Sequence, residues 1–286
     1  MESMLSLRDI SVGYGGKPVV TGVSFDIAAG EFCALLGLNG SGKTTLLKGL
    51  CGLLPVIGGR CFARGLDCTD FNEKERARIF SYIPQRFSKL ISVTVMDAVI
   101  MGLNAKLGML ELPSAADKAS AMEALEKMEI PHLAGEDFSR LSEGQKQLVI
   151  LARALVQNAP IMLMDEPDSS LDFPNKHRTL ARIRRLISDE SKAGLVTLHD
   201  PNLALAHCDR LVMLHDGKVA SDIRLAGAGA DEVRSCLSTI YGEVSLYEHG
   251  GKYCVQLYSM SMAFSNCNDG FLSSGAAEED GGLTPS

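Results

Sequence analysis

Apolar and polar positions alternate along residues 5–27, and glycines and a proline interrupt the pattern. Alternation with a period of two is typical of strands buried on one face, so this segment predicts short antiparallel strands. A continuous apolar run at 31–37 then predicts a strand, and a glycine-rich turn leads into a helical run that begins at Lys43. Strand, glycine loop and helix in this order form the start of a phosphate-binding α/β unit.

The pattern takes on a helical period from about residue 92 to residue 158, in runs such as SAADKASAMEALEKMEI and SEGQKQLVILARALVQN. We interpret this stretch, about 88–158, as a helical subdomain inserted into the α/β core. Short apolar runs stand on either side of it and predict strands. These runs are residues 79–83, 161–164, 194–199 and 211–219.

The end of the chain carries two further predictions. Two alternating runs flank Gly250 and Gly251 and indicate a hairpin at about 243–258. The tail from 259 to 286 is rich in Ser, Gly, Asn and acidic residues and poor in large apolar groups, which predicts disorder. Together the elements predict an α/β fold in which a phosphate-loop NTPase core carries an antiparallel β subdomain and the helical insertion.

Composition narrows the possible partners. Lys plus Arg number 28 and Asp plus Glu number 35, so the formal net charge of −7 argues against broad nucleic-acid binding. The start of the chain reaches Arg8 and Asp9 before any apolar core, so we predict no signal peptide. The window 91–110 contains Asp97 and Lys106, and it is better interpreted as an amphipathic helix than as a membrane span. Eight cysteines without a Cys-x-x-Cys pair indicate reduced thiols of an intracellular protein.

The strongest chemical signal is GLNGSGKT, which fits the pattern G-x-x-x-x-G-K-[ST] and lies between a predicted strand and a predicted helix. Its glycines let the backbone N–H groups surround phosphate oxygens, and the helix directs its positive end towards them. The ammonium group of Lys43 would supply a positive charge next to the β- and γ-phosphates, and the Thr44 hydroxyl would ligate Mg²⁺. The residues predicted to hold the nucleotide here are Gly37, Asn39, Gly40, Ser41, Gly42, Lys43, Thr44 and Thr45.

A second signal is IMLMDE at 161–166, a buried strand that ends in two carboxylates. Neighbouring side chains on a strand point in opposite directions, so the two acids should have different roles. Asp165 would hold Mg²⁺ through water, and Glu166 would face the γ-phosphate and polarise an attacking water. A merely structural acidic strand end is the alternative, and the phosphate loop upstream argues against it.

The segment LSEGQKQ at 141–147 resembles LSGGQ, the signature of ABC (ATP-binding cassette) ATPases, with Glu143 where the family most often has Gly. The resemblance covers roughly residues 4–256 and implies an ATP-hydrolysing ABC nucleotide-binding domain. In this family the signature helix presents its N-terminus to the γ-phosphate that another copy holds, whereas SEGQ taken alone is an ordinary helix cap. The residues carried over from the signature are Ser142, Gly144 and Gln145.

Other positions of the family match one by one. Tyr14 resembles the aromatic residue that stacks on adenine, and Gln85 resembles the glutamine that contacts Mg²⁺ and the attacking water. Asp172 resembles the aspartate that communicates across the dimer, and His199 resembles the switch histidine that contacts the γ-phosphate. Each also has a structural alternative, such as a core aromatic or a histidine at a strand end. Asp168 stands where the family more often has Thr.

Three softer strings, HDPNLALAHCDRLVMLHDGKV, LDFPN and IYGEVSLYEHGGKYCVQL, look like the subfamily that energises uptake of iron-siderophore, haem and cobalamin complexes. The resemblance implies a peripheral subunit at the cytoplasmic face of the inner membrane. Its expected partners are a second copy or a paralogue, separate transmembrane permease subunits and, indirectly, an external substrate-binding protein. Phe87 to about Gly102 is the expected permease-docking groove. The resemblance also implies that the catalytic residues are Lys43, Gln85, Glu166 and His199, which act on ATP with Mg²⁺.

Three alternatives stay open. A soluble ABC ATPase of the iron-sulfur assembly or translation-factor type would transport nothing, although the translation type usually carries two cassettes and this chain has one signature. A module that binds nucleotide without hydrolysing it is the second alternative, and the intact Lys43, Asp165, Glu166 and His199 argue against it. The cassette of a different importer or of an exporter is the third alternative, and the absence of a fused membrane span favours an importer.

Overall fold

An antiparallel sheet contains the first strands of the chain. The computed structural model describes residues 3–85, 93–106 and 111–257. The sheet has the order β2-β1-β4-β5, and the first pair corresponds to the strands predicted within 5–27. Its members are β1 (Ser3–Tyr14), β2 (Lys17–Ala28), β4 (Val56–Ala63) and β5 (Leu66–Asp67).

A six-stranded sheet forms the centre of the molecule, with the order β10-β9-β3-β8-β7-β6. All its pairs are parallel except β9 with β10. Parallel strands covered on both faces need continuous apolar runs, and every residue of β3, β7 and β8 is buried. The strands are β3 (Phe32–Leu36), β6 (Phe80–Ile83), β7 (Ile161–Asp165), β8 (Ala193–Thr197), β9 (Arg210–His215) and β10 (Lys218–Arg224).

The central sheet separates two hydrophobic cores, and strand β3 shows how its residues divide between them. Cys33 and Leu35 face the core shared with the antiparallel sheet and helix α1 (Lys43–Leu50). Phe32, Ala34 and Leu36 face the core shared with the helices on the other side. Successive strand residues point to opposite faces, so one apolar run can supply both cores.

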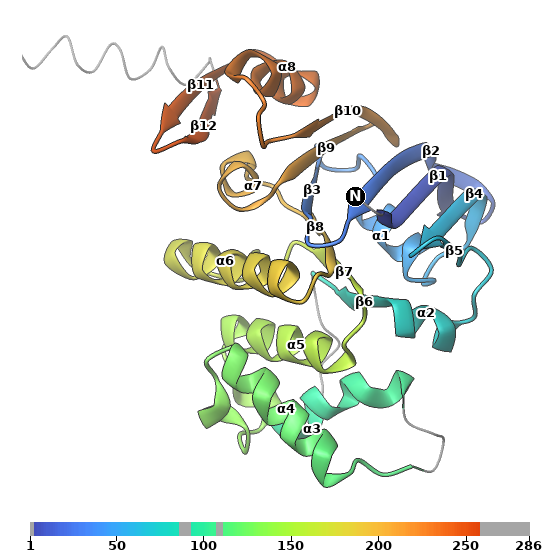
Figure 1. Cartoon of the computed structure of the whole chain (residues 1–286), viewed down its shortest axis with the longest axis vertical. Helices are drawn as coiled ribbons and strands as arrows, with labels where there is room; N and C mark the ends of the chain where they lie inside the picture. Colours follow the sequence, from blue (N-terminus) through green and yellow to red (C-terminus); the bar gives the residue numbers. More distant parts are fainter. Residues whose placement is uncertain (1–2, 86–92, 107–110, 258–286) are drawn as a thin grey trace, which may run out of the picture.

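Helices gather at one end of the molecule, below the central sheet in Figure 1. Residues 92–158, where the sequence predicts helices, contain α3 (Val95–Ile100), η1 (Met101–Ala105), α4 (Ala115–Lys127), η2 (Pro131–Leu133), η3 (Phe138–Arg140) and α5 (Glu143–Gln157). Among the described residues, no helix has both the length and the apolar character needed to cross a bilayer. The first part of the expected permease-docking groove, residues 87–92, lies outside the described residues.

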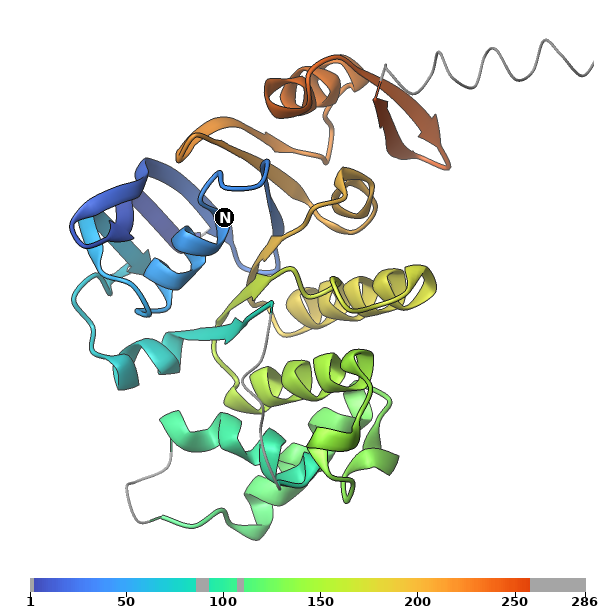
Figure 2. The same ribbon diagram turned by 180° about the vertical axis from the view of Figure 1, so that it is seen from behind.

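At the opposite end lie α8 (Ala230–Tyr241) and an antiparallel hairpin of β11 (Val244–His249) and β12 (Lys252–Leu257), as both views show (Figures 1 and 2). The predicted tail, 259–286, lies outside the described residues. The hydrophobic pattern did not predict β4, β5 or the helices α2 (Glu73–Ile79), α6 (Phe173–Asp189), α7 (Pro201–His207) and α8.

The topology brings the predicted chemistry to one edge of the central sheet. The phosphate loop follows the carboxyl end of β3, and Glu166 follows that of β7. Gln85 lies just beyond β6, and His199 lies just beyond β8. Because these four strands are parallel neighbours, their carboxyl ends meet at the same edge, where open α/β sheets bind ligands.

Candidate functional site

The loop between β3 and α1 has a shape that only glycine allows at three positions. Gly40 and Gly42 have φ angles of 81° and 102°, in the left-handed region that favours glycine. A Cβ on Gly37 would lie 2.5 Å from both the carbonyl oxygen of Leu214 and the hydroxyl of Ser41. The loop is therefore folded tightly over the N-terminus of α1.

Lys43, the first residue of α1, is held over this loop. Its Nζ donates to the carbonyl oxygens of Gly37, at 2.8 Å, and Leu38, at 3.2 Å. Burial lowers the pKa of Lys43, and the nearby carboxylates of Glu166 and Asp165 act in the opposite direction. A partly desolvated ammonium close to two acids is well placed to meet the oxygens of a multiply charged anion.

The donors of the loop fit a phosphate chain. Ser41 is buried, and its hydroxyl has no hydrogen-bond partner among the described residues. Buried hydroxyls normally have partners, so this group indicates an acceptor that a bound ligand would bring. Asn39 and Gly40 lie exposed at the tip of the loop, whereas Thr45 is buried inside α1.

Asp165 is the meeting point of three hydroxyl groups. The Thr44 hydroxyl donates to its Oδ1 at 3.0 Å, and the Thr197 hydroxyl donates to the same oxygen at 2.9 Å. The Tyr82 hydroxyl lies 3.4 Å from Oδ2, and burial, followed by the charge of Asp165, raises the pKa of Tyr82. These oxygen ligands beside a phosphate loop fit the preference of Mg²⁺.

Glu166 lies directly after β7 in a strained conformation. Its φ of 48° falls in the left-handed region, which costs a non-glycine residue about 1 kcal/mol or more. Its Oε1 lies 2.6 Å from Nε2 of His199, and its Oε2 accepts a hydrogen bond from Nε2 of Gln85. A buried carboxylate fixed from two sides in this way can orient and polarise a water molecule.

Thr197 supports both acids, and sequence reasoning missed it. Its hydroxyl donates to Asp165 and accepts a hydrogen bond from the backbone N–H of Glu166 at 2.9 Å. Thr197 is fully buried. A single hydroxyl within the otherwise apolar strand GLVTL was the available signal, because buried polar groups need partners.

Tyr14 ends β1 and is 52% exposed, so its ring is available for stacking. Burial is the main cause of the raised pKa of Tyr82, and Tyr14 is near enough to contribute to that shift. Val12, two residues before Tyr14, pairs with Val20, and a Cβ on Gly42 would lie 2.7 Å from the Val20 side chain, so this end of β1 lies near the phosphate loop.

The signature residues lie apart from this cluster. Ser142 caps α5: its hydroxyl accepts from the N–H of Gln145 at 3.2 Å, and the Gln145 side chain accepts from the N–H of Ser142 at 3.0 Å. Gly144 abuts Leu171, because a Cβ on Gly144 would lie 3.2 Å from the Leu171 side chain. A groove of about 750 Å³ joins these three residues to α6, and no phosphate-loop residue lines it.

Asp172 and two unusual positions have clear structural roles. Asp172 caps α6 by accepting from the N–H of Asn175 at 3.0 Å. Glu143, where the family most often has Gly, lies in the first turn of α5 and pairs with Lys146 at 2.8 Å. An acid at this end of a helix is favourable. Asp168 is buried, and its charge is compensated by Lys176, whose Nζ lies 3.3 Å from its carboxylate.

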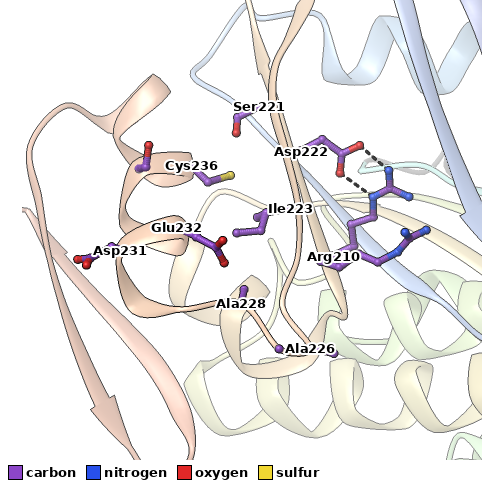
Figure 3. Close-up of a pocket in the computed structure, with 12 residues that line it drawn as sticks. Arg210, Ser221, Asp222, Ile223, Ala226, Ala228, Asp231, Glu232 and Cys236 are labelled. Atoms are coloured by element: carbon purple, nitrogen blue, oxygen red, sulfur yellow. Dashed lines mark hydrogen bonds and ion pairs between the residues drawn. The ribbon is translucent and has the colours of Figure 1, made fainter.

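A larger groove, of about 910 Å³, lies between β10 and α8 (Figure 3) and contains none of the predicted site residues. Its charged groups are already partnered. Arg210 pairs with Asp222, and Arg224 donates to Glu31 at 3.1 Å. The Glu232 side chain accepts from the backbone at the start of α8. Compensated charges leave little to attract an ionic ligand, so we assign this groove no ligand.

Comparisons with known proteins agree with this geometry. The model of the ABC transporter family matches residues 20–169. An uncharacterized ABC transporter ATP-binding protein of Haemophilus influenzae is 40% identical over 211 residues, which are 74% of this chain and 80% of the relative. The hemin import ATP-binding protein HmuV of Streptomyces coelicolor is 35% identical over 254 residues, 87% of each chain.

A solved structure described as a metal-chelate type ABC transporter, in an inward-facing conformation, superimposes with a TM-score of 0.74 at 25% identity. The match covers 89% of this chain and 96% of that one. It confirms the predicted fold class, a phosphate-loop α/β core with antiparallel and helical parts. The chain therefore belongs to the ABC transporter family and is one of its ATP-hydrolysing, ATP-binding subunits.

Proposed function

We propose that this chain energises an importer of metal chelates of the iron-siderophore, haem or cobalamin type. The observation that carries the proposal is the similarity over 87% of the chain to a hemin import ATP-binding protein. The likeness to a transporter described as metal-chelate type supports it independently. Soluble ABC ATPases of the iron-sulfur or translation type are the second candidate, and no feature of the site favours them.

Within one copy, the phosphate loop binds the triphosphate of ATP and Tyr14 stacks on the adenine. Lys43 and the start of α1 balance the charge of the phosphates. Glu166, which His199 and Gln85 hold from either side, orients the attacking water and draws its proton. Thr44, Asp165 and Gln85 would hold Mg²⁺, which would neutralise phosphate charge when bound.

A second copy of the chain, or a paralogue, completes each site. Ser142, Gly144 and Gln145 open a helix whose N-terminal end attracts anions, yet in their own chain they line a separate groove. We assign these residues to the γ-phosphate bound by the partner, and Asp172 to communication across the dimer.

The dimer works as a peripheral assembly on the cytoplasmic face of the membrane. Separate permease subunits form the channel, and an external binding protein delivers the chelate to them. Closure and opening of the ATPase dimer pass to the permease through the helical insertion next to Gln85. Residues 93–102, which include α3 and the start of η1, are the described part of the docking surface in this proposal.

The test of the catalytic assignment is Glu166→Gln. Loss of the base should lower kcat about 10²- to 10⁴-fold, while ATP binding and an ATP-dependent dimer persist. Phosphate release and size-exclusion chromatography with ATP measure the two effects. Glu123→Gln, the same change on the exposed face of α4, is the control. Normal turnover in Glu166→Gln would refute the role of Glu166.

The test of the cargo uses the complete transporter in lipid vesicles. The ATPase, its permease and its binding protein should hydrolyse ATP faster when one metal chelate is supplied. Haem, a ferric siderophore and cobalamin are compared with the metal-free siderophore as the control. Equal rates with every chelate and with none would contradict an importer of this type.

A further inference from the structure

Two of the three softer strings of the sequence contact each other in the structure. Asn202 belongs to HDPN, and Val255 belongs to the C-terminal hairpin, 53 residues later. The Asn202 side chain donates to the carbonyl oxygen of Val255 at 3.2 Å and accepts from its N–H at 2.8 Å. The amide thus pairs with both backbone groups of one residue, as a neighbouring strand would.

This contact lies at the start of α7, three residues after His199. Asp200 caps α7 by accepting from the N–H of Asn202 at 2.8 Å, and Pro201 fixes the first turn. Only two residues separate His199 from Asn202, and the Asp200 cap and the Pro201 ring restrict the backbone between them. A shift of Asn202 would move the backbone that carries the His199 imidazole.

A continuous path leads from the hairpin to Glu166. Val255 holds Asn202, Asn202 and Asp200 hold the first turn of α7, and His199 contacts Glu166 at 2.6 Å. The hairpin is itself braced, since β12 packs along α7 (Figure 1) and the hydroxyl of Tyr253 donates to the carbonyl of Ala228 at 3.2 Å.

We propose that Asn202 is a positioning residue for hydrolysis, through which the C-terminal hairpin fixes His199 against Glu166. Among the described residues, no hydrogen bond joins the hairpin directly to the phosphate loop, so an effect of the hairpin on hydrolysis has to pass through α7. The inference rests on the proposed role of His199. It gives the hairpin a part in setting the rate of ATP hydrolysis.

The test is a double-mutant cycle of Asn202→Ala with His199→Ala in the full chain. Asn202→Ala should lower kcat about 10- to 100-fold, because small displacements of a catalytic group are costly, and should leave the KM for ATP unchanged. In the His199→Ala background, Asn202→Ala should have no further effect on kcat. A residue that only supports the fold would lower kcat by the same factor in both backgrounds, and that result overturns the inference.

Two further variants keep the test decisive. Asn202→Asp is almost the same size, keeps the acceptor for the Val255 N–H and loses the donor, so it covers the case in which the alanine variant does not fold. Lys252→Met is the matched control, because Lys252 donates from the hairpin to Ala206 at 2.5 Å, at the far end of α7. It should leave kcat unchanged.

The outcomes separate the two claims. If His199→Ala hydrolyses ATP normally, the proposed role of His199 fails and the inference about Asn202 falls with it. If His199→Ala is slow but both Asn202 variants are as fast as wild type, only the inference falls.

Discussion

The phosphate-loop cluster and the signature region use similar polar residues in opposite ways. In the cluster, Asp165 and Glu166 receive hydrogen bonds from four side chains in three separate segments of the chain. In the signature region, the side chains of Ser142 and Gln145 each accept from the backbone N–H of the other residue, within one helical turn. The side chains of the first region are held by contacts distant in sequence, whereas those of the second are held within one helical turn.

The difference suggests where each region finds its ligand. Long-range contacts fix Glu166 before any ligand arrives, which suits a catalytic group that must be preorganised. Local capping leaves the remaining N–H groups of the first turn of α5 free to meet an anion from outside the chain. We infer that one copy supplies the phosphate loop and the catalytic residues, and that a second copy supplies the signature residues that cover the γ-phosphate.

The largest expected effect tests whether Ser142 contributes to hydrolysis beyond capping α5. Ser142→Arg should lower kcat about 10²- to 10³-fold, the usual cost of losing a group that stabilises developing charge. It should leave ATP binding by the isolated chain unchanged. Phosphate release and nucleotide titration measure the two quantities.

The control for this variant is Ser114→Arg. Ser114 caps α4 with the same reciprocal bonds to Asp117, so both variants should lose about 1 kcal/mol of capping energy. Only the variant at Ser142 should lose hydrolysis. Equal losses of activity in both would mean that Ser142 acts only as a cap.

A smaller effect tests the long-range hydrogen bonds of the phosphate-loop cluster. Thr197→Val keeps the shape but removes the hydroxyl that joins Asp165 to the N–H of Glu166, leaving that buried N–H without a partner. The free energy of unfolding should fall by about 1–3 kcal/mol, and kcat should fall with it. Urea denaturation measures the first quantity. Thr179→Val is the control, since Thr179 is buried in α6 without a side-chain hydrogen bond in the described part of the chain.

The sequence predicted the local parts of this account and missed the distant ones. Residues 37–44 are consecutive, so their pattern alone predicts a strand, a loop and a helix. The bonds of Thr197 to Asp165 and of Asn202 to Val255 join segments 32 and 53 residues apart, and no spacing rule reports such pairs. Helix α6 was missed because its mainly polar sequence buries only a narrow stripe, which includes Leu180 and Ile183.

The smallest effect concerns a contact between two histidines, one on α6 and one on α7. Nδ1 of His177, on α6, lies 2.9 Å from Nε2 of His207, on α7. Burial first, then charge repulsion from His177 and Lys252, lowers the pKa of His207 to about 4. The unfolded chain binds this proton near pH 6.5, so the free energy of unfolding should fall as the pH drops from about 6.5 to about 4.

The size of this pH effect should be on the order of 1 kcal/mol, because His207 is only half-buried and solvent screens its neighbours. Thermal unfolding across this pH range measures it. His207→Gln should flatten the pH dependence, whereas His132→Gln, at an exposed position, should not. An unchanged slope in His207→Gln would assign the pH dependence to other groups.

The most direct test of the two-copy site mixes two inactive variants. Lys43→Ala lacks a working phosphate loop, and Ser142→Arg lacks a working signature, so neither should hydrolyse ATP alone. If each site combines the loop of one copy with the signature of another, a mixed dimer has one intact site, and phosphate release should reappear when the variants are combined. Continued inactivity of a mixture shown to contain mixed dimers would contradict the account.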